Sequence, residues 1–325
     1  MTSLDSLEQA LPGLVREAQQ LNKMAVARLI SLFEDDREGS AVLRSQTLRL
    51  LDANPDTDTA GRRGRILGLT GTPGSGKSSL LSRITVDLLE RNAELSLAVL
   101  AIDPSSQVSG GALLGDRTRM RFLPAEKRLF FRSQASQTDL GGLGPSSFQV
   151  CRLLSRLFDC VMIETVGIGQ SEADIRHLAD RVYLVLQPLG GDEVQFLKAG
   201  IIEIPHAFIL NKSDEPTALK SFHHLRSSMW LARPFESEDL PIFQTSALTG
   251  AGLEELESEM LRQIESGGTA GLEMREPYFL DRWVHQEFGK SGGRFLAQQL
   301  GGATVFIAQA GGYEQAQAAF SQAFG

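Results

Sequence analysis

The sequence has little of several residue types that define whole classes of protein. Its 325 residues contain two cysteines, Cys151 and Cys160, so the pattern indicates neither a disulfide framework nor a cysteine-based zinc site. Cys160 opens an apolar run and is expected to be a small core residue. Histidine is also scarce, with five residues, of which only His223 and His224 are adjacent. Transition-metal sites usually need a richer cluster of such ligands.

Long apolar runs and excess positive charge are missing as well. No stretch reaches about 18 apolar residues, and the first residues lack the basic start and apolar run of a secretory signal. The net charge of −8 argues against non-specific binding to nucleic acid. Hydrophobic residues make up 42% of the chain and charged residues 22%, which is typical of a globular protein. We therefore expect a cytoplasmic protein without a nucleic-acid or membrane partner.

One stretch, RILGLTGTPGSGKSSLLS at 65–82, carries specific chemistry. A short apolar run precedes a match to G-x-x-x-x-G-K-S, and an apolar pattern of helical spacing follows it. The glycines let backbone N–H groups converge on an anion, and the start of the helix adds partial positive charge. Lys77 can reach the outer phosphates, and the Ser78 hydroxyl can bind magnesium. The stretch predicts a nucleotide phosphate site formed by Gly71, Thr72, Pro73, Gly74, Ser75, Gly76, Lys77, Ser78 and Ser79.

Apolar runs of strand length alternate with helical patterns from residue 65 to about residue 265. Nearly every position within these runs is apolar, which is typical of parallel strands covered on both faces. We predict an α/β fold of the P-loop NTPase type, with a doubly wound, mostly parallel sheet. The predicted strands are 65–70, 96–103, 128–132, 160–165, 181–187, 205–211 and 241–245.

Helical patterns flank these strands on both sides. Residues 4–52 predict two or three helices with a break near residue 39, and the polar residues 53–64 predict a linker. Residues 272–300 again have helical spacing, whereas 301–325 are rich in Gly, Ala and Gln and leave strand and helix both open. The predicted domains are an N-terminal helical extension with its linker (1–60), a P-loop core (61–268) and a C-terminal helical extension (269–325).

The residues Asn211-Lys212-Ser213-Asp214 follow an apolar run and indicate the identity of the base. A carboxylate at Asp214 can accept hydrogen bonds from N1–H and the exocyclic amine of guanine, which adenine does not offer. The Asn211 side chain would hold the loop, and the Lys212 stem would pack on the base plane. The next run leads to Ser246-Ala247-Leu248, where a backbone N–H can meet the guanine carbonyl. An ordinary strand-to-helix turn is the alternative interpretation.

Two carboxylates follow other apolar runs. Many GTPases carry a magnesium-binding Asp at the position of Glu164, and the Gly167 N–H would then sense the γ-phosphate. A carboxylate that caps the turn is the alternative. Asp103 ends a further run. Because doubly wound sheets bind ligands at the carboxyl ends of their strands, Asp103 and Glu164 can share one phosphate crevice.

A Gly-rich and then charged stretch, residues 110–120, is a candidate loop that orders over phosphate and magnesium. Asp116 could ligate magnesium or position the attacking water, and Arg119 could neutralise charge in the transition state. A solvated ion pair is the alternative for both residues. With Lys77, Gly167 and Gln170 they form the candidate catalytic set.

A second mobile candidate is the stretch 188–198, in which two glycines precede a helical pattern opened by acids. Its residues Asp192, Gln195 and Lys198 fall on one helical face. From the spacing alone, that face could contact a partner or lie in water.

In chain order, GTPGSGKS, AIDPSSQVSGGALLGDRTRM, VMIETVGIGQSEAD, GGDEVQFLKAGI and NKSD resemble one group of GTPases. This group, the MeaB, ArgK and MMAA type of the SIMIBI class, accompanies methylmalonyl-CoA mutase and other cobalamin-dependent acyl-CoA mutases. The resemblance implies GTP hydrolysis, with magnesium-site residues at Ser78, Asp103, Asp116 and Glu164. It also implies a chaperone that gates adenosylcobalamin loading, a homodimer built partly by terminal helices, and a third switch at 188–198 that reports nucleotide state to the mutase.

Other functions stay open from the residues alone. A nickel-delivery or other metallocentre-maturation GTPase would share the fold class, but such proteins usually carry clustered His or Cys ligands. A small-molecule kinase could use the same phosphate loop, although NKSD and the Glu164–Gly167 element favour a guanine switch. A protein-targeting GTPase would need a Met-rich domain, and seven scattered methionines do not supply one.

Overall fold

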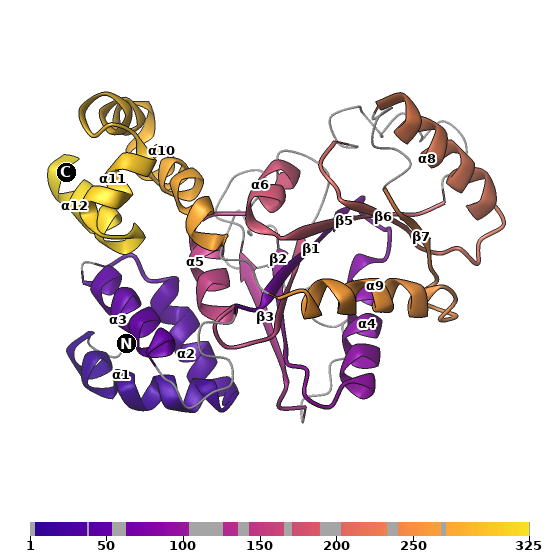
Figure 1. The fold of residues 1–325 in the computed structure, drawn as a ribbon, viewed down its shortest axis with the longest axis horizontal. Coiled ribbons are helices and arrows are strands. Elements are labelled where there is room, and N and C mark those ends of the chain that lie inside the picture. Colours follow the sequence, from indigo (N-terminus) through magenta and orange to yellow (C-terminus); the bar gives the residue numbers. More distant parts are fainter. Residues whose placement is uncertain are drawn as a thin grey trace. The chain divides into compact units, whose positions relative to one another are not determined.

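The computed structural model describes residues 4–37, 39–53, 63–103, 126–135, 143–165, 171–188, 203–232, 240–267 and 271–324. The chain forms two compact units (Figure 1). The sheet unit contains 65–143 and 159–268, and the helical unit contains 1–64, 144–158 and 269–325. The two terminal segments, which the sequence analysis treats separately, therefore belong to one unit, together with a helix from the middle of the chain.

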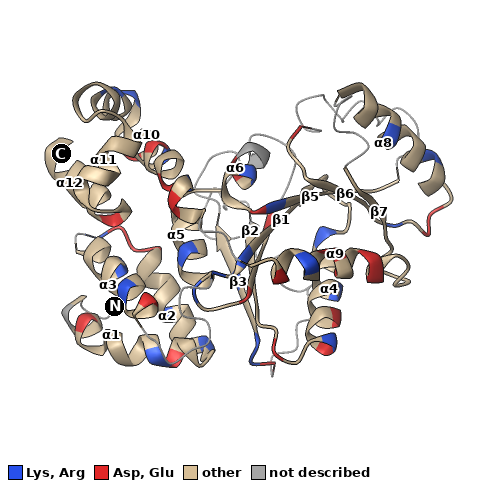
Figure 2. Cartoon of the chain, viewed as in Figure 1, with Lys and Arg blue, Asp and Glu red and all other residues tan. Residues whose placement is uncertain are grey.

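Seven parallel strands form the sheet, in the order β3-β2-β4-β1-β5-β6-β7. This confirms the predicted doubly wound parallel sheet, and each predicted strand overlaps one observed strand. Figure 2 shows that charged residues gather on the helices while the strands are mostly uncharged. The strands are β1 (Arg65–Gly71), β2 (Leu97–Asp103), β3 (Leu129–Ala135), β4 (Cys160–Thr165), β5 (Arg181–Leu186), β6 (Ala207–Leu210) and β7 (Ile242–Gln244).

Alternate residues of the strands enter different clusters of buried side chains. Leu67 and Leu69 of β1 pack with α4 (Lys77–Arg91) and α9 (Leu253–Glu265) in one cluster. Leu184 of β5 packs instead with α8 (Ala218–Ala232). Between these alternating positions, Gly68 lies so close to Ile175 of α6 (Ser171–Leu178) that a Cβ on Gly68 would come within 2.7 Å of it. Since both strand faces are covered, nearly every strand position is apolar.

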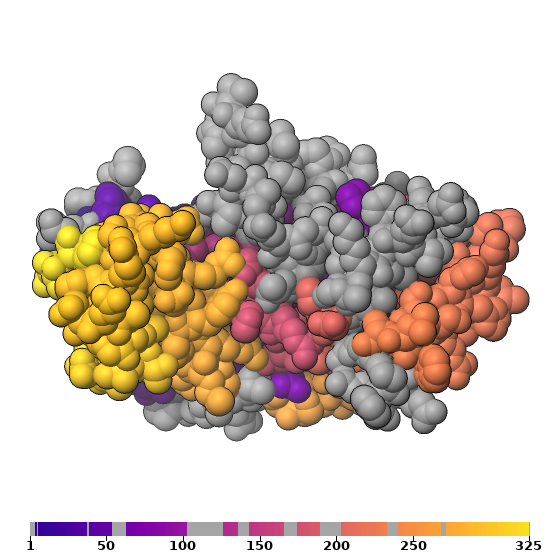
Figure 3. Space-filling view, turned by 90° about the horizontal axis from the view of Figure 1, so that it is seen from above, coloured from indigo at the N-terminus to yellow at the C-terminus, as the bar shows by residue number. Residues whose placement is uncertain are grey.

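The described part of the second unit contains helices and their connections, and no strand. They are α1 (Leu4–Gln19), α2 (Lys23–Phe33), α3 (Ser40–Asp52), α5 (Pro145–Leu154), α10 (Leu272–Gln299), α11 (Ala303–Ala310) and α12 (Tyr313–Phe324). The N-terminal segment thus forms three helices, with the break at the predicted place. The C-terminal stretch that the sequence leaves open between strand and helix is helical, and α10, α11 and α12 contact one another and form one continuous surface in Figure 3.

Aromatic side chains hold the C-terminal helices together. Gly289, with φ of 63°, interrupts the helical backbone of α10. On either side of it, Phe288 and Phe295 both contact Phe320 of α12, with ring centroids 5.1 Å and 5.9 Å away. Phe320 is fully buried, and its ring also meets that of Phe306 from α11. This cluster accounts for the folding of a stretch whose composition has little periodicity, because burial of large rings stabilises it.

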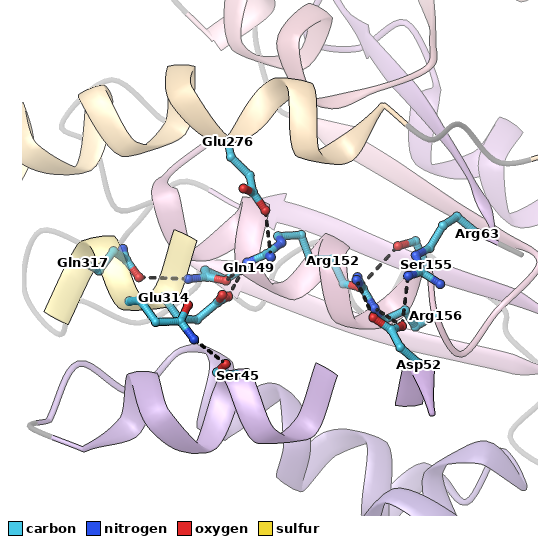
Figure 4. A network of polar contacts seen from close by, with 11 residues as sticks. Ser45, Asp52, Arg63, Gln149, Arg152, Ser155, Arg156, Glu276, Glu314 and Gln317 are labelled. Atoms are coloured by element: carbon cyan, nitrogen blue, oxygen red, sulfur yellow. Dashed lines mark hydrogen bonds and ion pairs between the residues drawn. The ribbon is translucent and has the colours of Figure 1, made fainter. Parts of the chain in front are cut away.

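A buried polar network joins α5 to the terminal helices (Figure 4). The Arg152 guanidinium of α5 forms ion pairs with Glu276 of α10, at 2.8 Å, and with Glu314 of α12. Beside it, Gln149 donates to the Gln317 side chain at 3.0 Å. Burial raises the pKa of Glu276 to about 7, even though Arg152 lowers it. The network therefore contains a carboxyl group that takes up a proton near neutral pH.

We expect Glu276 to make stability depend on pH. Between its ordinary pKa of 4.5 and the folded value of about 7, the folded chain binds more protons than the unfolded chain at this group. Its contribution to the free energy of unfolding therefore falls as pH rises through this window. We therefore expect the free energy of unfolding of the natural protein, measured with urea and compared with that of Glu276→Gln, to fall by about 1–3 kcal/mol between pH 5 and pH 8.

Glu287→Gln, about three turns further along α10 at an exposed position, is the matched control and should follow the natural protein at every pH. Stability curves for Glu276→Gln and the natural protein that run parallel from pH 5 to pH 8 would contradict the assignment.

Candidate functional site

The phosphate loop connects β1 to α4, and its backbone has a shape that glycine alone fits. Gly71 has φ of 147°, and a Cβ there would lie 2.0 Å from the Val185 carbonyl oxygen of β5. Gly76 caps the start of α4 with φ of 82°, and its Cβ would lie 2.6 Å from the Asn211 amide nitrogen. Strand β5 at Gly71 and the Asn211 side chain at Gly76 approach the loop too closely for any side chain at these two positions. The glycines thus serve packing as well as the anion-binding geometry.

Lys77 holds a positive charge inside this loop. The residue is 6% exposed, and its Nζ donates to the carbonyl oxygens of Gly71 at 2.9 Å and Thr72 at 3.0 Å. Because these carbonyls belong to the loop itself, the ammonium is held at the loop beside the start of α4. A buried cation at a helix N-terminus is suited to a polyanion such as a nucleotide phosphate chain.

Ser78 and Glu164 bring two oxygen donors together at the same place. Glu164 of β4 is 4% exposed, and its Oε1 accepts a hydrogen bond of 2.6 Å from the Ser78 hydroxyl. Strands β1 and β4 pair in parallel with Leu69 opposite Glu164, and this register brings Glu164 level with the loop that leads to Ser78. Hydroxyl and carboxylate oxygens fit magnesium, which binds few protein ligands and completes its shell with water and phosphate.

Other predicted magnesium ligands are only partly described. Asp103 ends β2, which pairs with β4, so its backbone lies at the carboxyl edge of the sheet that also carries Glu164. Within the described ranges no group of three or more His, Cys, Asp and Glu residues could hold a metal ion. The adjacent His223 and His224 lie on α8, and the cysteines are buried free thiols whose pKa burial raises.

The Asn211 amide ties three loops to one another. Its Nδ2 donates to the Ser75 carbonyl of the phosphate loop at 2.8 Å, and its Oδ1 accepts from the Ala247 N–H at 3.1 Å. The side chain is 1% exposed, so these bonds form away from water. The phosphate loop, the 211–214 loop and the 245–248 loop are thereby held at set distances. The sequence predicts that Asn211 holds its own loop, and the structure shows bonds from its side chain to the two other loops.

The predicted base-contacting residues differ in exposure. Asp214 is exposed, and Leu248 is 83% exposed, so both face solvent beside the loops that Asn211 joins. Ser246 is buried and turns its backbone N–H inward, to the Ala251 carbonyl at 2.9 Å. Lys212 has φ of 59° and donates from Nζ to the Gln187 side-chain oxygen at 2.7 Å.

Gln187 is a residue of this site that the sequence analysis missed. It directly follows β5, where a polar residue ends an apolar run ahead of Pro188. Its position at the carboxyl end of a strand was the available signal. The remaining candidates, which stay predictions, lie outside the described residues: Asp116, Arg119, Gly167, Gln170, Asp192, Gln195 and Lys198.

Residues 26–285 match the family model described as methylmalonyl-CoA mutase-associated GTPase MeaB. The chain belongs to the MeaB family. A presumptive GTPase of Pyrococcus horikoshii is 37% identical over 256 residues, which cover 76% of each chain. The GTPase ArgK of Escherichia coli is 33% identical over 255 residues, covering 77% of this chain and 74% of ArgK.

The fold also has a solved relative. A structure titled LAO/AO transport system kinase matches with a TM-score of 0.62 at 21% identity, and the match covers 93% of this chain and 91% of that chain. This likeness confirms the P-loop NTPase-like fold with terminal helices. MeaB membership adds guanine-nucleotide binding as a family property. None of the described helices combines the length and apolar character needed to cross a membrane.

Asn211→Asp tests the loop connection, because it keeps the shape of the side chain and removes the donor to Ser75. A carboxylate would then face a carbonyl oxygen, so we expect a loss of about 2 kcal/mol in the free energy of unfolding. We also expect guanine-nucleotide affinity to fall about tenfold or more, since the loops lose their spacing. Urea unfolding and fluorescent GDP titration measure the two effects.

Asn92→Asp is the matched control, since its amide also donates to a carbonyl, that of Leu88, at the far end of α4. It should leave nucleotide affinity unchanged. Equal affinities for Asn211→Asp and the natural protein would refute the connection.

Proposed function

We propose that this MeaB-family protein hydrolyses GTP to GDP and phosphate, and that it thereby gates adenosylcobalamin loading into a cobalamin-dependent acyl-CoA mutase and protects that enzyme. The observation that carries the nucleotide part is the Asn211 amide, which joins a phosphate loop to a base-reading loop. The mutase part rests on the family description. Methylmalonyl-CoA mutase or a relative is the proposed partner.

Each phosphate-site residue has a proposed task. Lys77 would exchange its two loop carbonyls for phosphate oxygens, which it can reach from the start of α4. Ser78 and Glu164 would hold magnesium, with Asp103 and Asp116 as further ligands. Magnesium, when bound, supplies positive charge to the phosphates. Gly71–Ser79 would surround the phosphate chain with backbone N–H groups.

The base would be read by the loops that follow β6 and β7. Asp214 would accept from guanine N1–H and the exocyclic amine, and the Lys212 stem would cover the base plane. Ser246 and Ala247 already donate their N–H groups to Ala251 and Asn211. We therefore propose that the Leu248 N–H meets the guanine carbonyl.

Turnover by the free protein should be slow, and a partner should accelerate it. Asp116, Arg119, Gly167 and Gln170 are the proposed hydrolysis residues, and Asp192, Gln195 and Lys198 the proposed partner-facing ones. From the resemblance to the family, we propose that the protein is cytoplasmic and forms a homodimer through its terminal helices. Residues 61–268 are the proposed catalytic domain, between extensions 1–60 and 269–325.

GTP turnover by the purified protein, alone and with a panel of cobalamin-dependent acyl-CoA mutases, tests this function. We expect one mutase to stimulate GTP hydrolysis, with a coupling of about 1–3 kcal/mol, while ATP stays inert. Lys77→Ala should abolish nucleotide binding without unfolding the chain. If hydrolysis is specific for GTP but no mutase changes its rate, the cobalamin assignment is wrong. If the protein transfers phosphate from ATP to a small molecule, it is a kinase and the GTPase assignment is wrong.

Asp214→Asn tests base recognition. The amide donates where the carboxylate accepts, so GTP affinity should fall about 100-fold while xanthosine triphosphate gains relative to GTP. Competition of the two nucleotides against fluorescent GDP measures the preference. Glu215→Gln, one residue on, should keep the natural preference. If Asp214→Asn has the same ratio of affinities for GTP and xanthosine triphosphate as the natural protein, Asp214 does not read the base.

A further inference from the structure

The carboxyl end of β5 emerges between the two halves of the proposed nucleotide site. In the sheet, β5 lies between β1, which leads to the phosphate loop, and β6, which leads to Asn211. On one side, Val185 lies against Gly71; on the other, the Leu186 carbonyl accepts the Asn211 N–H at 2.8 Å. Gln187 is the next residue. Chain topology therefore places its amide where phosphate and base recognition meet.

Gln187 bonds to one half and lies close to the other. Its Oε1 accepts the 2.7 Å hydrogen bond from the Lys212 ammonium. Its amide group also lies over Gly74 of the phosphate loop, since a Cβ on Gly74 would be 3.8 Å from Nε2 and 3.9 Å from Oε1. The Lys212 head is thus anchored from the strand that separates the two loops.

Lys212 needs such an anchor. Its backbone φ of 59° is one that residues with a side chain seldom adopt, so neighbouring contacts must stabilise it. A lysine side chain is also long and flexible, and ordering it on binding costs conformational entropy. A head group that is already bonded to Gln187 leaves the four-carbon stem ordered before nucleotide arrives.

We propose that Gln187 is a positioning residue for the guanine base, which acts by fixing the Lys212 stem over the base plane and thereby slows nucleotide release. The inference rests on the proposed GTPase function and adds a residue to its base-binding half. Asn211 holds the loop backbone, whereas Gln187 holds the side chain that covers the base. Because the bond to Lys212 is charge-assisted, it is stronger than an ordinary side-chain hydrogen bond.

Release of fluorescent GDP from the full chain measures the effect. Gln187→Ala should release GDP about 5- to 20-fold faster than the natural protein, which is the loss expected for a charge-assisted bond that is partly exposed. Gln187→Glu keeps an acceptor for Lys212 and should restore release to within about threefold, now with a dependence on salt. Gln46→Ala, which removes a glutamine of α3 in the helical unit, is the control and should release GDP at the natural rate.

The double variant Gln187→Ala/Lys212→Ala separates positioning from general stability. If Gln187 acts through Lys212, the double variant should release GDP no faster than Lys212→Ala alone. Two results would overturn the inference: a release rate in the double variant that equals the product of the two single-variant effects, or a Gln187→Ala release rate within about twofold of the natural one. A natural protein that binds no GDP would overturn the proposed function, and the role of Gln187 with it.

Discussion

The proposed nucleotide site depends on a buried amide that joins loops from two strands, β1 and β6, which are not adjacent in the sheet. Strand β5 separates β1 from β6, so the loops that follow β1 and β6 have no ladder of backbone hydrogen bonds to set their spacing. Asn211 supplies that spacing with one donor and one acceptor. A side chain with both functions is required, since a carboxylate lacks the donor and an aliphatic residue lacks both. Because Asn211 is only 1% exposed, no water could take the place of a missing hydrogen-bond partner of its amide.

Gln187 extends the same logic to a side chain. Asparagine and glutamine stand at the carboxyl ends of adjacent strands, β6 and β5, and each amide reaches across to a neighbouring loop. Together they connect the phosphate loop to Lys212 and to the 245–248 loop. In a parallel sheet all strand ends meet at one edge, which lets short polar side chains assemble a site from distant parts of the chain.

The helical unit shows a different way of joining distant segments. Helix α5 lies between β3 and β4 in the chain, yet Arg152 from this helix pairs with Glu314, which is 162 residues away. Burial raises the pKa of its second partner, Glu276, to about 7, and the charge of Arg152 acts in the opposite direction. Removing one partner of such a group leaves an uncompensated buried charge. The middle of the chain is thereby tied to the C-terminal segment within one unit.

Local patterns in the sequence determined the strands and the phosphate loop, because burial on both faces demands apolar runs and phosphate binding demands closely spaced glycines. The meeting of Ser78 with Glu164, the proposed magnesium ligands, could also be expected from the sequence, since the carboxyl ends of parallel strands lie at one edge of the sheet. Tertiary structure alone decided three features: the bonds of Asn211 to Ser75 and Ala247, the anchoring of Lys212 by Gln187, and the pairing of Arg152 with Glu314. Each of these joins residues far apart in the chain, and their partners are chosen by strand order and helix packing, which no local pattern of residues encodes.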